Sequence, residues 1–343
     1  MRIAVVCDVG PLVGAGHAMR CLALVAALRD EGTSVAWFSP VTSLGWLGGV
    51  ELGNDEVIDV SGTGSTERAV LDWRPDLVLV DSYVRPRSFG DLLLAADVPV
   101  VSINDPSTPR RSASLFVWPG FGLHQGAADG SVLSGPQYVL IRRQILAARG
   151  EKPAIEDAGA PGERQHVGVL MGGANAAEST WAVARALEQI DLDLAIHVNV
   201  PTPADRNLPA VARHEVVTHR AGTAYWETLR RCHFVVSAAG VSAWELACLG
   251  IPMGLVLVAD NQSENYWGMT SRGWALGLGA SEQMAIDSRP LSNRVSAALH
   301  DDAGSRQMAT RAWAAVDGGG ADRVGAEIRK RFWKVGSIGP DRR

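Results

Sequence analysis

The amino-acid sequence predicts an α/β protein built from two Rossmann-like, doubly wound domains. Short apolar runs alternate with longer amphipathic stretches, and this alternation occurs twice along the 343 residues. Short apolar runs are typical of strands buried on both faces of a parallel sheet. The chain is also roughly twice as long as an average domain of ~150 residues. We therefore expect two domains that face one interdomain cleft.

Eight apolar runs are predicted to be strands. They are residues 3–7, 34–38, 77–80 and 98–103 in the first half, and 167–171, 195–200, 234–237 and 253–258 in the second. The stretches between them carry apolar residues at helical spacing, as in residues 21–28 and 181–187. Strand and helix thus alternate in each half, as in a doubly wound sheet.

The domain boundaries are predicted from breaks in this alternation. Residues 147–165 are rich in Gly, Ala, Pro and charged residues, which indicates a linker. We therefore expect an N-terminal domain over residues 1–150 and a C-terminal domain over 165–317. Three consecutive glycines then open residues 318–343, which are predicted to form a helix with a basic end at 329–331, followed by a tail.

Composition and charge exclude several classes of protein. The 32 basic residues against 37 acidic ones give a net charge of −5, so we expect no nucleic-acid partner. No stretch approaches the ~18 apolar residues of a membrane span, and the first apolar run is too short for a signal peptide. We therefore expect a cytoplasmic protein without a membrane partner. The four cysteines form no C-x-x-C pair and are expected to be buried thiols.

A glycine-rich turn precedes the first predicted helix. The first strand ends near Asp8, and the following sequence G-A-G-H-A-M-R contains Gly16, His17 and Arg20. Glycines at such a turn let a ligand approach the backbone closely. Near the amino end of a helix the macrodipole disfavours an imidazolium, so we expect a neutral His17 that can accept a proton, with Arg20 on nearly the same face. The alternative is a capping histidine and a surface arginine.

Polar side chains follow two further strands of the first half. Asp81 and Tyr83 come directly after the third apolar run, and Asp105 follows the fourth. Because open α/β sheets build their sites at the carboxyl ends of strands, we expect these side chains to converge on the edge that also carries Asp8. Arg85 borders this edge and is a candidate contact for an acidic substrate group. A solvated loop arginine is the alternative.

The second half contains a strand, a glycine turn and a helix in succession. Gly172 and Gly173 form the turn, and Asn175 follows it. Free backbone N–H groups in this arrangement bind phosphate. The sequence lacks the Lys-Ser/Thr pair of a P-loop and the third glycine of a dinucleotide-binding turn. ATP hydrolysis and NAD chemistry are therefore disfavoured, and no cofactor is expected.

Two more strand ends of the second half carry candidate binding groups. Gly240 lies in a turn that opens a helix, and Glu245 lies more than one turn inside that helix, where a carboxylate can accept both hydroxyls of a ribose. A solvent-facing glutamate is the alternative, because a buried one needs a partner. Asn261 and Gln262 follow the last predicted strand, and their amides suit sugar hydroxyls since they both donate and accept.

Together these motifs resemble the GT-B glycosyltransferase superfamily, and within it the UDP-sugar hydrolases of pseudaminic acid synthesis and their spore-coat relatives. The motifs that carry the resemblance are Asp8, Gly14-x-Gly16-His17-x-x-Arg20, Asp81-x-Tyr83, Asp105, Leu140-Ile141-Arg142, Met171-Gly172-Gly173, Glu245 and Asn261-Gln262. The resemblance covers roughly residues 1–280. Residues 237–252 also resemble the donor-binding helix of the undecaprenyl-linked N-acetylglucosaminyl transferases.

The resemblance implies a role for each motif. It implies that His17 is a general base assisted by Asp8 and Tyr83, and that no metal takes part. It also implies that the second domain holds UDP, with the diphosphate at the glycine turn, the ribose at Glu245 and the sugar at Asn261. The residues assigned to donor binding are Gly16, Arg20, Gly172, Gly173, Asn175, Gly240, Glu245, Asn261 and Gln262. The residues assigned to acceptor binding are Asp81, Arg85 and Asp105.

The reaction predicted from the sequence is metal-independent, inverting transfer from a UDP-sugar to a small acceptor, such as a natural product or a nucleobase. Hydrolysis of the UDP-sugar is the alternative. Transfer is favoured because Asn104, Arg143 and Asn175 depart from the hydrolase pattern and the chain is about 60 residues longer. A third hypothesis is a non-catalytic sugar-nucleotide sensor, which would need no base.

Overall fold

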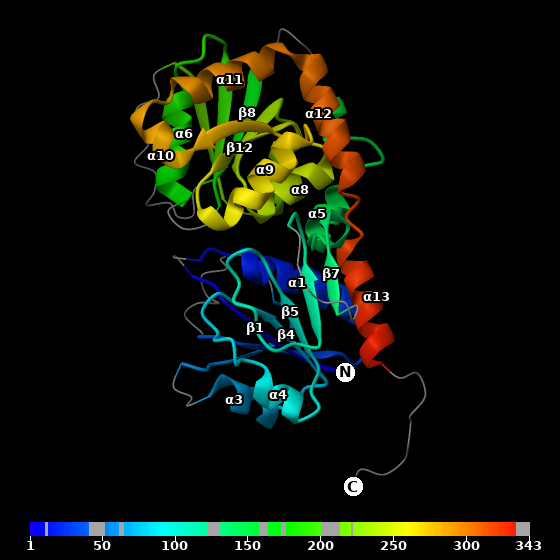
Figure 1. Cartoon of the computed structure of the whole chain (residues 1–343). Coiled ribbons are helices and arrows are strands. Elements are labelled where there is room, and N and C mark those ends of the chain that lie inside the picture. Colours follow the sequence, from blue (N-terminus) through cyan, green and yellow to red (C-terminus); the bar gives the residue numbers. More distant parts are fainter. Residues whose placement is uncertain are drawn as a thin grey trace.

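Two parallel β-sheets, one in each half of the chain, form the framework of the molecule (Figure 1). The computed structural model describes residues 1–10, 13–40, 52–61, 65–122, 131–157, 164–172, 176–199, 213–220 and 222–333. All eight predicted strands are present, and helices flank both sheets. The predicted α/β fold with two Rossmann-like domains is therefore confirmed.

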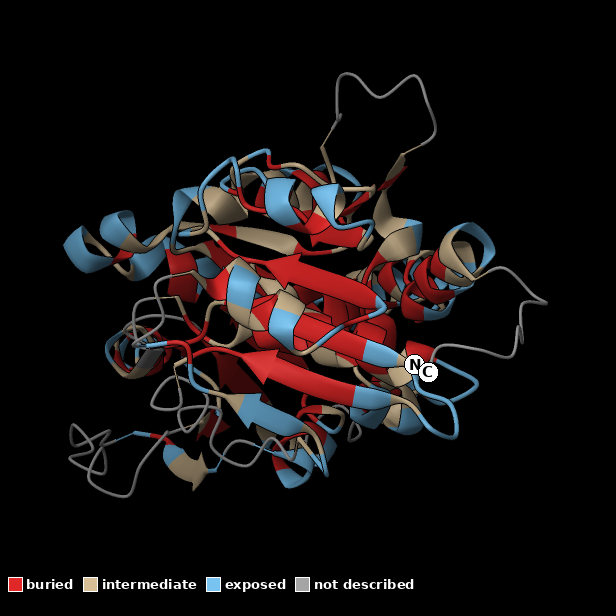
Figure 2. Cartoon of the chain, turned by 90° about the horizontal axis from the view of Figure 1, so that it is seen from below, coloured by how far each residue is buried: buried red, intermediate tan, exposed pale blue. Residues whose placement is uncertain are grey.

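The first sheet has seven strands in the order β3-β2-β1-β4-β5-β6-β7, and every neighbouring pair is parallel. The strands are β1 (Arg2–Cys7), β2 (Ser34–Phe38), β3 (Glu56–Ile58), β4 (Leu77–Asp81), β5 (Val100–Ile103), β6 (Leu115–Trp118) and β7 (Val132–Ser134). The helices of this half are α1 (Gly16–Leu28), α3 (Thr66–Asp72) and α4 (Asp91–Ala95). The central strands β4 and β5 are buried along their whole length, as Figure 2 shows in red for the middle layer.

The second sheet has six strands in the order β10-β9-β8-β11-β12-β13, again all parallel. The strands are β8 (Gln165–Leu170), β9 (Leu194–Asn199), β10 (Glu215–His219), β11 (Phe234–Ala238), β12 (Met253–Leu257) and β13 (Leu276–Ala280). The helices of this half are α6 (Ala176–Leu187), α7 (Thr223–Leu229), α8 (Val241–Leu249), α9 (Ser263–Ser271), α10 (Ser281–Ile286), α11 (Arg289–His300) and α12 (Asp302–Ala315).

Five strands lie outside the predicted apolar runs: β3, β6, β7, β10 and β13. β3 and β7 have only three residues each, and β6 has four. β10 lies at the edge of its sheet and is only partly buried, and two glycines interrupt β13. Very short or exposed strands such as β3, β7 and β10 bury few side chains, so they do not produce the apolar run of a central strand. β6 is apolar and buried at three of its four positions, much like β5, and the prediction missed it.

The chain passes between the two halves through an extended segment. Val139 and Ile141 pack in the core around the second sheet, whereas Leu140 between them packs in the core of the first. Neighbouring side chains of extended backbone point to opposite sides, so one short segment can serve both cores. Ile145 of α5 (Arg143–Ala148) continues in the second core. The chain thus enters the second core upstream of the predicted boundary at residue 150.

The last helix returns to the first half. α13 (Gly320–Phe332) lies beside α1 (Figure 1), and three of its residues join the first hydrophobic core: Ala321, Val324 and Ile328. Arg329, from the predicted basic helix end, donates a hydrogen bond to the main-chain oxygen of Ala27 at 2.7 Å. The helix therefore ties the end of the chain to its beginning. The predicted tail beyond it, residues 334–343, lies outside the described residues.

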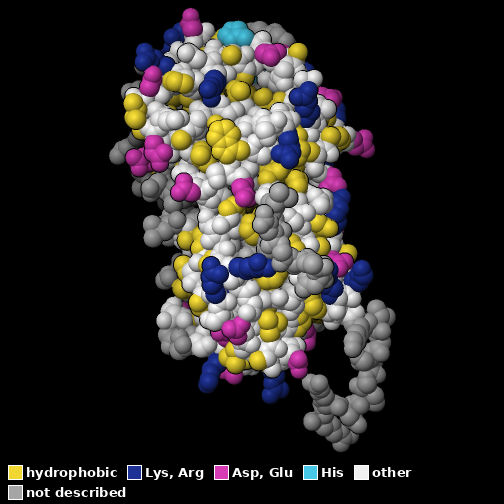
Figure 3. Space-filling view, viewed as in Figure 1, with side chains coloured by type: hydrophobic (Ala, Val, Ile, Leu, Met, Phe, Trp, Pro, Cys, Tyr) yellow, Lys and Arg dark blue, Asp and Glu magenta, His cyan; other side chains and the backbone are white. Residues whose placement is uncertain are grey.

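Both signs of charge occur side by side on the face of the molecule drawn in Figure 3, where basic and acidic side chains alternate with apolar ones. The described cysteines are all buried and free. Among the helices that the structure describes, none has the length and apolar character needed to cross a bilayer.

A row of imidazole rings crosses three strands of the second sheet. Nδ1 of His166 on β8 lies 2.8 Å from Nε2 of His197 on β9, and Nδ1 of His197 lies 3.0 Å from Nε2 of His219 on β10. Each contact requires one ring to donate and the other to accept, so the row is satisfied by neutral rings. Burial and then the two neighbouring rings lower the pKa of His197 to about 4.

Mild acid is expected to destabilise the second domain. The pKa of folded His197 lies below that of an unfolded histidine, so the unfolded chain binds more protons as pH falls from about 6.5 towards 4. We expect the unfolding free energy to drop by on the order of 2 kcal/mol over this interval, and His197→Gln to reduce that drop. Denaturation midpoints at pH 7.5 and 5.0 measure both effects. The exposed His300→Ala is the control, and an equal drop in His197→Gln would contradict the prediction.

Candidate active site

A cleft of about 1210 Å³ lies between the two halves. It is lined by residues that follow strands of both sheets, including His17 and Asn104 from the first and Gly172, Gly240 and Asn261 from the second. Ligand sites of parallel sheets form at the carboxyl ends of strands. The volume slightly exceeds the ~300–1,000 Å³ of common small-molecule sites, so the cleft has room for two reactants.

His17 stands at the first turn of α1, where the sequence predicted it. Gly14, with a φ of +79°, turns the chain into the helix, which begins at Gly16. The ring is buried, and its Nδ1 lies 2.8 Å from Oδ1 of Asp81 and 3.0 Å from the main-chain oxygen of that residue. Within the part of the chain that the structure describes, Nε2 of His17 has no hydrogen-bond partner. His17 is among the residues that line the cleft.

The charge of His17 is set by its contact with Asp81. Burial opposes a charged ring, but the facing carboxylate outweighs burial, so the pKa of His17 is raised above 6.5. We predicted a neutral ring from the helix macrodipole alone. The ion pair shifts the pKa of His17 in the direction opposite to that of the macrodipole, because a carboxylate at 2.8 Å acts far more strongly than the partial charge of a helix end. The neutral ring stays a prediction.

Asp81 is completely buried and is held on both sides. Arg20 donates from Nε to Oδ2 and from Nη2 to Oδ1, both at 2.8 Å. Burial alone would raise the pKa of Asp81, but Arg20 and His17 lower it. We predicted that Asp81 contacts the acceptor. The structure encloses this carboxylate between His17 and Arg20 and does not place it in the lining of the cleft, so its contact with an acceptor stays a prediction.

Arg20 lines the cleft, yet its nitrogens are already occupied. Besides Asp81, it binds Oδ2 of Asp105 through Nη1 and Nη2, each at 3.3 Å. Burial would lower the pKa of Arg20, but the two carboxylates raise it. A donor group that binds Arg20, as predicted, would therefore share its guanidinium with Asp81 and Asp105.

Asp8 and Arg85 hold the loop after β4 rather than the base or a ligand. Oδ2 of Asp8 accepts hydrogen bonds from the main-chain N–H groups of Tyr83 at 2.6 Å and Val84 at 3.3 Å. Arg85 donates from Nη1 to Thr66 at 2.8 Å and does not line the cleft. In the structure Asp81, and not Asp8, contacts the ring of His17, and the assisting role of Asp8 stays a prediction. Asp81 is brought close to His17 because β4 pairs in parallel with β1, and the sequence did not predict which strands pair.

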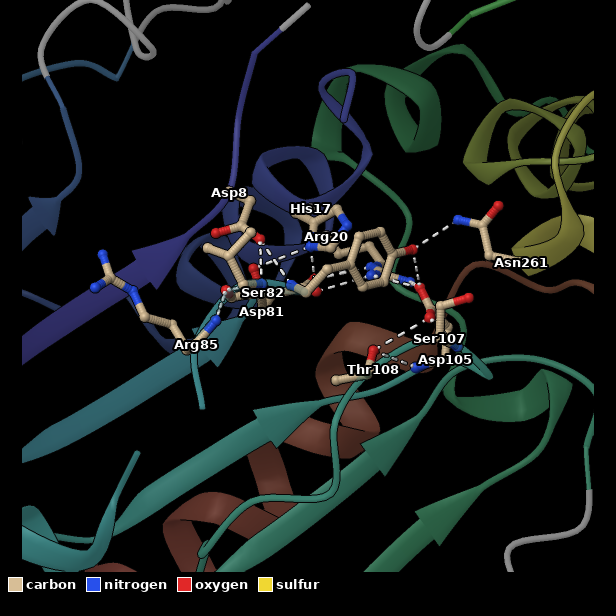
Figure 4. A network of polar contacts seen from close by, with 12 residues as sticks. Asp8, His17, Arg20, Asp81, Ser82, Arg85, Asp105, Ser107, Thr108 and Asn261 are labelled. Carbon is tan, nitrogen blue, oxygen red and sulfur yellow. Dashed lines mark hydrogen bonds and ion pairs between the residues drawn. The ribbon is translucent and has the colours of Figure 1, made fainter. Parts of the chain in front are cut away.

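Tyr83 joins the two halves of the cleft. Its hydroxyl donates to Oδ2 of Asp105 at 2.6 Å and accepts from Nδ2 of Asn261 at 2.7 Å. Its ring meets that of His17 edge to face, with centroids 4.3 Å apart. Figure 4 follows this network from Asp8 and His17 to Asn261. Three predicted site residues, Tyr83, Asp105 and Asn261, therefore meet at one hydroxyl, and His17 packs on the ring that carries it.

The second half presents the amino end of α8 to the cleft. Gly240 precedes the helix, and Gly240, Val241 and Ser242 all line the cleft. The first N–H groups of a helix have no partner within it and attract anions. Gly172 lies nearby, since a Cβ added there would be 3.8 Å from Oγ of Ser242. Gln262 also lines the cleft. The other predicted residues of this region, Gly173 and Asn175, lie outside the described residues.

Glu245 is buried in α8 and forms an ion pair. Nε of Arg142 lies 2.6 Å from its Oε1, and the guanidinium of Arg142 lies 6.0 Å from the ring of Trp226. Both Glu245 and Arg142 line the cleft. The sequence alternative of a solvent-facing glutamate is wrong. Arg142 supplies the partner that a buried carboxylate needs, although its spacing of 103 residues gave no signal for the pairing.

An aromatic wall completes the cleft, and sequence reasoning did not identify it. Trp118 and Phe121 from the first half and Trp244 of α8 all line the cleft, and the rings of Phe121 and Trp244 lie 5.1 Å apart. Trp118 ends β6 and Phe121 follows it closely, whereas Trp244 belongs to α8, far along the chain, so no local pattern links the two sides. Elsewhere among the described residues, no group of three or more His, Cys, Asp or Glu side chains is arranged to hold a metal ion.

The fold is the GT-B fold, with the cleft between its two Rossmann-like domains. MurG from Acinetobacter baumannii is similar over 96% of this chain and 99% of its own, with a TM-score of 0.67 and 16% identity. The rhamnosyltransferase SpnG of spinosyn is similar over 96% and 99%, with a TM-score of 0.65 and 19% identity.

A putative UDP-N-acetylglucosamine 2-epimerase from Listeria monocytogenes has the same fold, with a TM-score of 0.63 over 97% of each chain and 15% identity. No family model and no curated protein sequence matches this chain. Because the fold occurs in transferases and in an epimerase, it does not by itself fix the reaction. The narrower resemblance to UDP-sugar hydrolases stays a prediction from the sequence motifs.

Replacing Asp81 by Asn is expected to lower the pKa of His17. The neutral amide keeps the shape of the side chain but removes the charge that offsets burial, so burial then dominates. We expect the titration of His17 to move to lower pH. NMR titration of protein with labelled histidine measures it, with the His17 resonance assigned from a His17→Gln variant. An unchanged His17 titration in Asp81→Asn would contradict the ion-pair interpretation.

Proposed function

We propose that the protein is a metal-independent, inverting glycosyltransferase that uses a nucleoside diphosphate sugar, most simply a UDP-sugar. The observation that carries the proposal is the pairing of His17 with Asp81 opposite the amino end of α8. Nε2 of His17 has no partner among the described residues, and both groups line the cleft. A base and an anion-binding helix end that face each other suit displacement of a diphosphate from a sugar.

In this reaction His17 is the general base. With Nδ1–H donating to Asp81, the lone pair of Nε2 accepts the acceptor's proton as the oxygen or nitrogen attacks the anomeric carbon. The imidazolium that forms is stabilised by the carboxylate of Asp81 at 2.8 Å. A single attack opposite the leaving group inverts the anomeric configuration. Because the pKa of His17 is raised, the base loses activity as pH falls below that pKa.

The second half is proposed to bind the donor. The N–H groups at the start of α8 stabilise the negative charge that develops on the leaving diphosphate. Glu245, held by Arg142, is positioned for the ribose, while Asn261 and Gln262 are proposed to bind the sugar. Proteins of the same fold support such a donor, since SpnG was solved with thymidine diphosphate and UGT89C1 of Arabidopsis thaliana with UDP-L-rhamnose.

An organic acceptor is favoured over water by the size and lining of the cleft. Trp118 and Phe121 give the first half an aromatic surface, which suits a flat or carbohydrate-like acceptor. SpnG, of the same fold, was also solved with the spinosyn aglycone. Hydrolysis of the nucleotide sugar is the second candidate, because Nε2 of His17 can equally activate water. A sensor without catalysis is the third, and the base with its carboxylate partner counts against it.

A panel of UDP- and dTDP-sugars tests the proposed function. Release of the nucleoside diphosphate is followed with and without a small-molecule cell extract as a source of acceptors. Release that depends on the extract supports transfer, and release without it supports hydrolysis. Binding of a nucleotide sugar with no release under either condition would instead support a sensor.

Replacement of His17 by Ala is expected to slow nucleotide release by roughly 10²- to 10⁴-fold, because a positioned general base contributes about that much. The affinity for UDP should stay nearly unchanged, since His17 belongs to the opposite domain. The loss of rate at acid pH should also disappear. Steady-state rates and calorimetric UDP titration measure these effects, with His300→Ala as the control. Retained turnover in His17→Ala would refute the assigned base.

A further inference from the structure

An unbroken row of polar contacts runs from the base to the opposite domain. The row passes through His17, Asp81, Arg20, Asp105, Tyr83 and Asn261, with separations of 2.6–3.3 Å (Figure 4). Its first five members belong to the first half, and Asn261 follows β12 of the second. The hydroxyl of Tyr83 is therefore the point at which the row crosses the cleft.

The direction of these hydrogen bonds follows from their chemistry. An ionised Asp105 can only accept, so the proton of the Tyr83 hydroxyl points to Asp105 and the oxygen accepts from Nδ2 of Asn261. The amide of Asn261 is thereby oriented, with its nitrogen towards Tyr83 and its oxygen turned away, as Figure 4 shows. Asn261 lines the cleft, so that oxygen remains available to a hydroxyl of a bound sugar.

We propose that Tyr83 is a positioning residue: its hydroxyl holds Asn261, and with it the donor sugar, in register with Nε2 of His17. The proposal rests on the proposed function, since it assigns a role within that reaction. Arg20 binds both Asp81, which contacts His17, and Asp105, which contacts Tyr83. The carboxylates that hold His17 and Tyr83 are therefore linked to each other through one guanidinium. A donor sugar placed by Asn261 is then placed relative to the base as well, and small errors in such placement slow a reaction strongly.

This role gives a physical form to the assistance that the family resemblance implies for Tyr83. Burial and then Asp105 raise the pKa of Tyr83, so the hydroxyl keeps its proton at neutral pH. The groups proposed for the diphosphate and ribose lie at Gly240 and Glu245, at the start of α8 and within it, whereas Tyr83 contacts the second half through Asn261. Tyr83 is therefore expected to affect the rate of transfer rather than the affinity for the nucleotide.

Four proteins test the proposal: Tyr83→Phe, Asn261→Ala, the double variant, and Tyr138→Phe as a matched loss of a hydroxyl outside the cleft. Tyr83→Phe keeps the ring that packs on His17. We expect kcat to fall about 10- to 100-fold in Tyr83→Phe, with the Kd for UDP changed less than about 3-fold and the acid limb of the pH profile unmoved. The double variant should be no slower than the slower single variant, because both remove one contact.

A readout without catalysis separates this proposal from the proposed function. Thermal midpoints of the same proteins form a double-mutant cycle, in which a real contact makes the double variant's Tm loss smaller than the sum of the single losses. If the Tm losses are non-additive but the wild-type protein releases no nucleotide, the contact is upheld and the proposed function is refuted. Three results would each overturn the positioning role: additive Tm losses in the double variant, an unchanged kcat in Tyr83→Phe, or a shift in the acid limb of the pH profile of Tyr83→Phe.

Discussion

The buried carboxylate of Asp81 is the group on which the arrangement of the site depends. It accepts two hydrogen bonds from Arg20 and faces Nδ1 of His17, so one fully enclosed charge fixes both side chains. A buried carboxylate is costly unless it is paired and hydrogen-bonded. The contacts that offset the cost of burying Asp81 therefore also set the orientation and the pKa of the His17 ring, which lines the cleft.

The two domains depend on each other through contacts of different kinds. A polar contact joins Tyr83 to Asn261, while close packing brings Gly16 to Val241, where an added Cβ would lie only 3.3 Å from Cγ2. The segment at residues 139–141 links the two halves covalently and packs in both cores, and α13 packs in the core of the first half. The cleft is consequently shaped by both halves, and neither half alone contains a complete candidate site.

Local sequence patterns predicted most of the fold but not its edges. Central strands such as β4 are buried on both faces, so they must be apolar throughout and are visible in the sequence. Edge strands such as β3 bury less and leave no such run. Likewise, the turn at Gly16 placed His17 at a helix start, because backbone geometry there is a local property.

What the sequence alone determined is therefore the alternation of strands and helices, the glycine turns, and the strand ends that carry His17, Tyr83, Asp105 and Asn261. Only the tertiary structure decided which of these groups contact one another. The pairing of His17 with Asp81 and of Arg142 with Glu245 joins residues 64 and 103 positions apart. Such pairings follow from strand order and domain approach, and those are set by packing over the whole chain rather than by neighbouring residues.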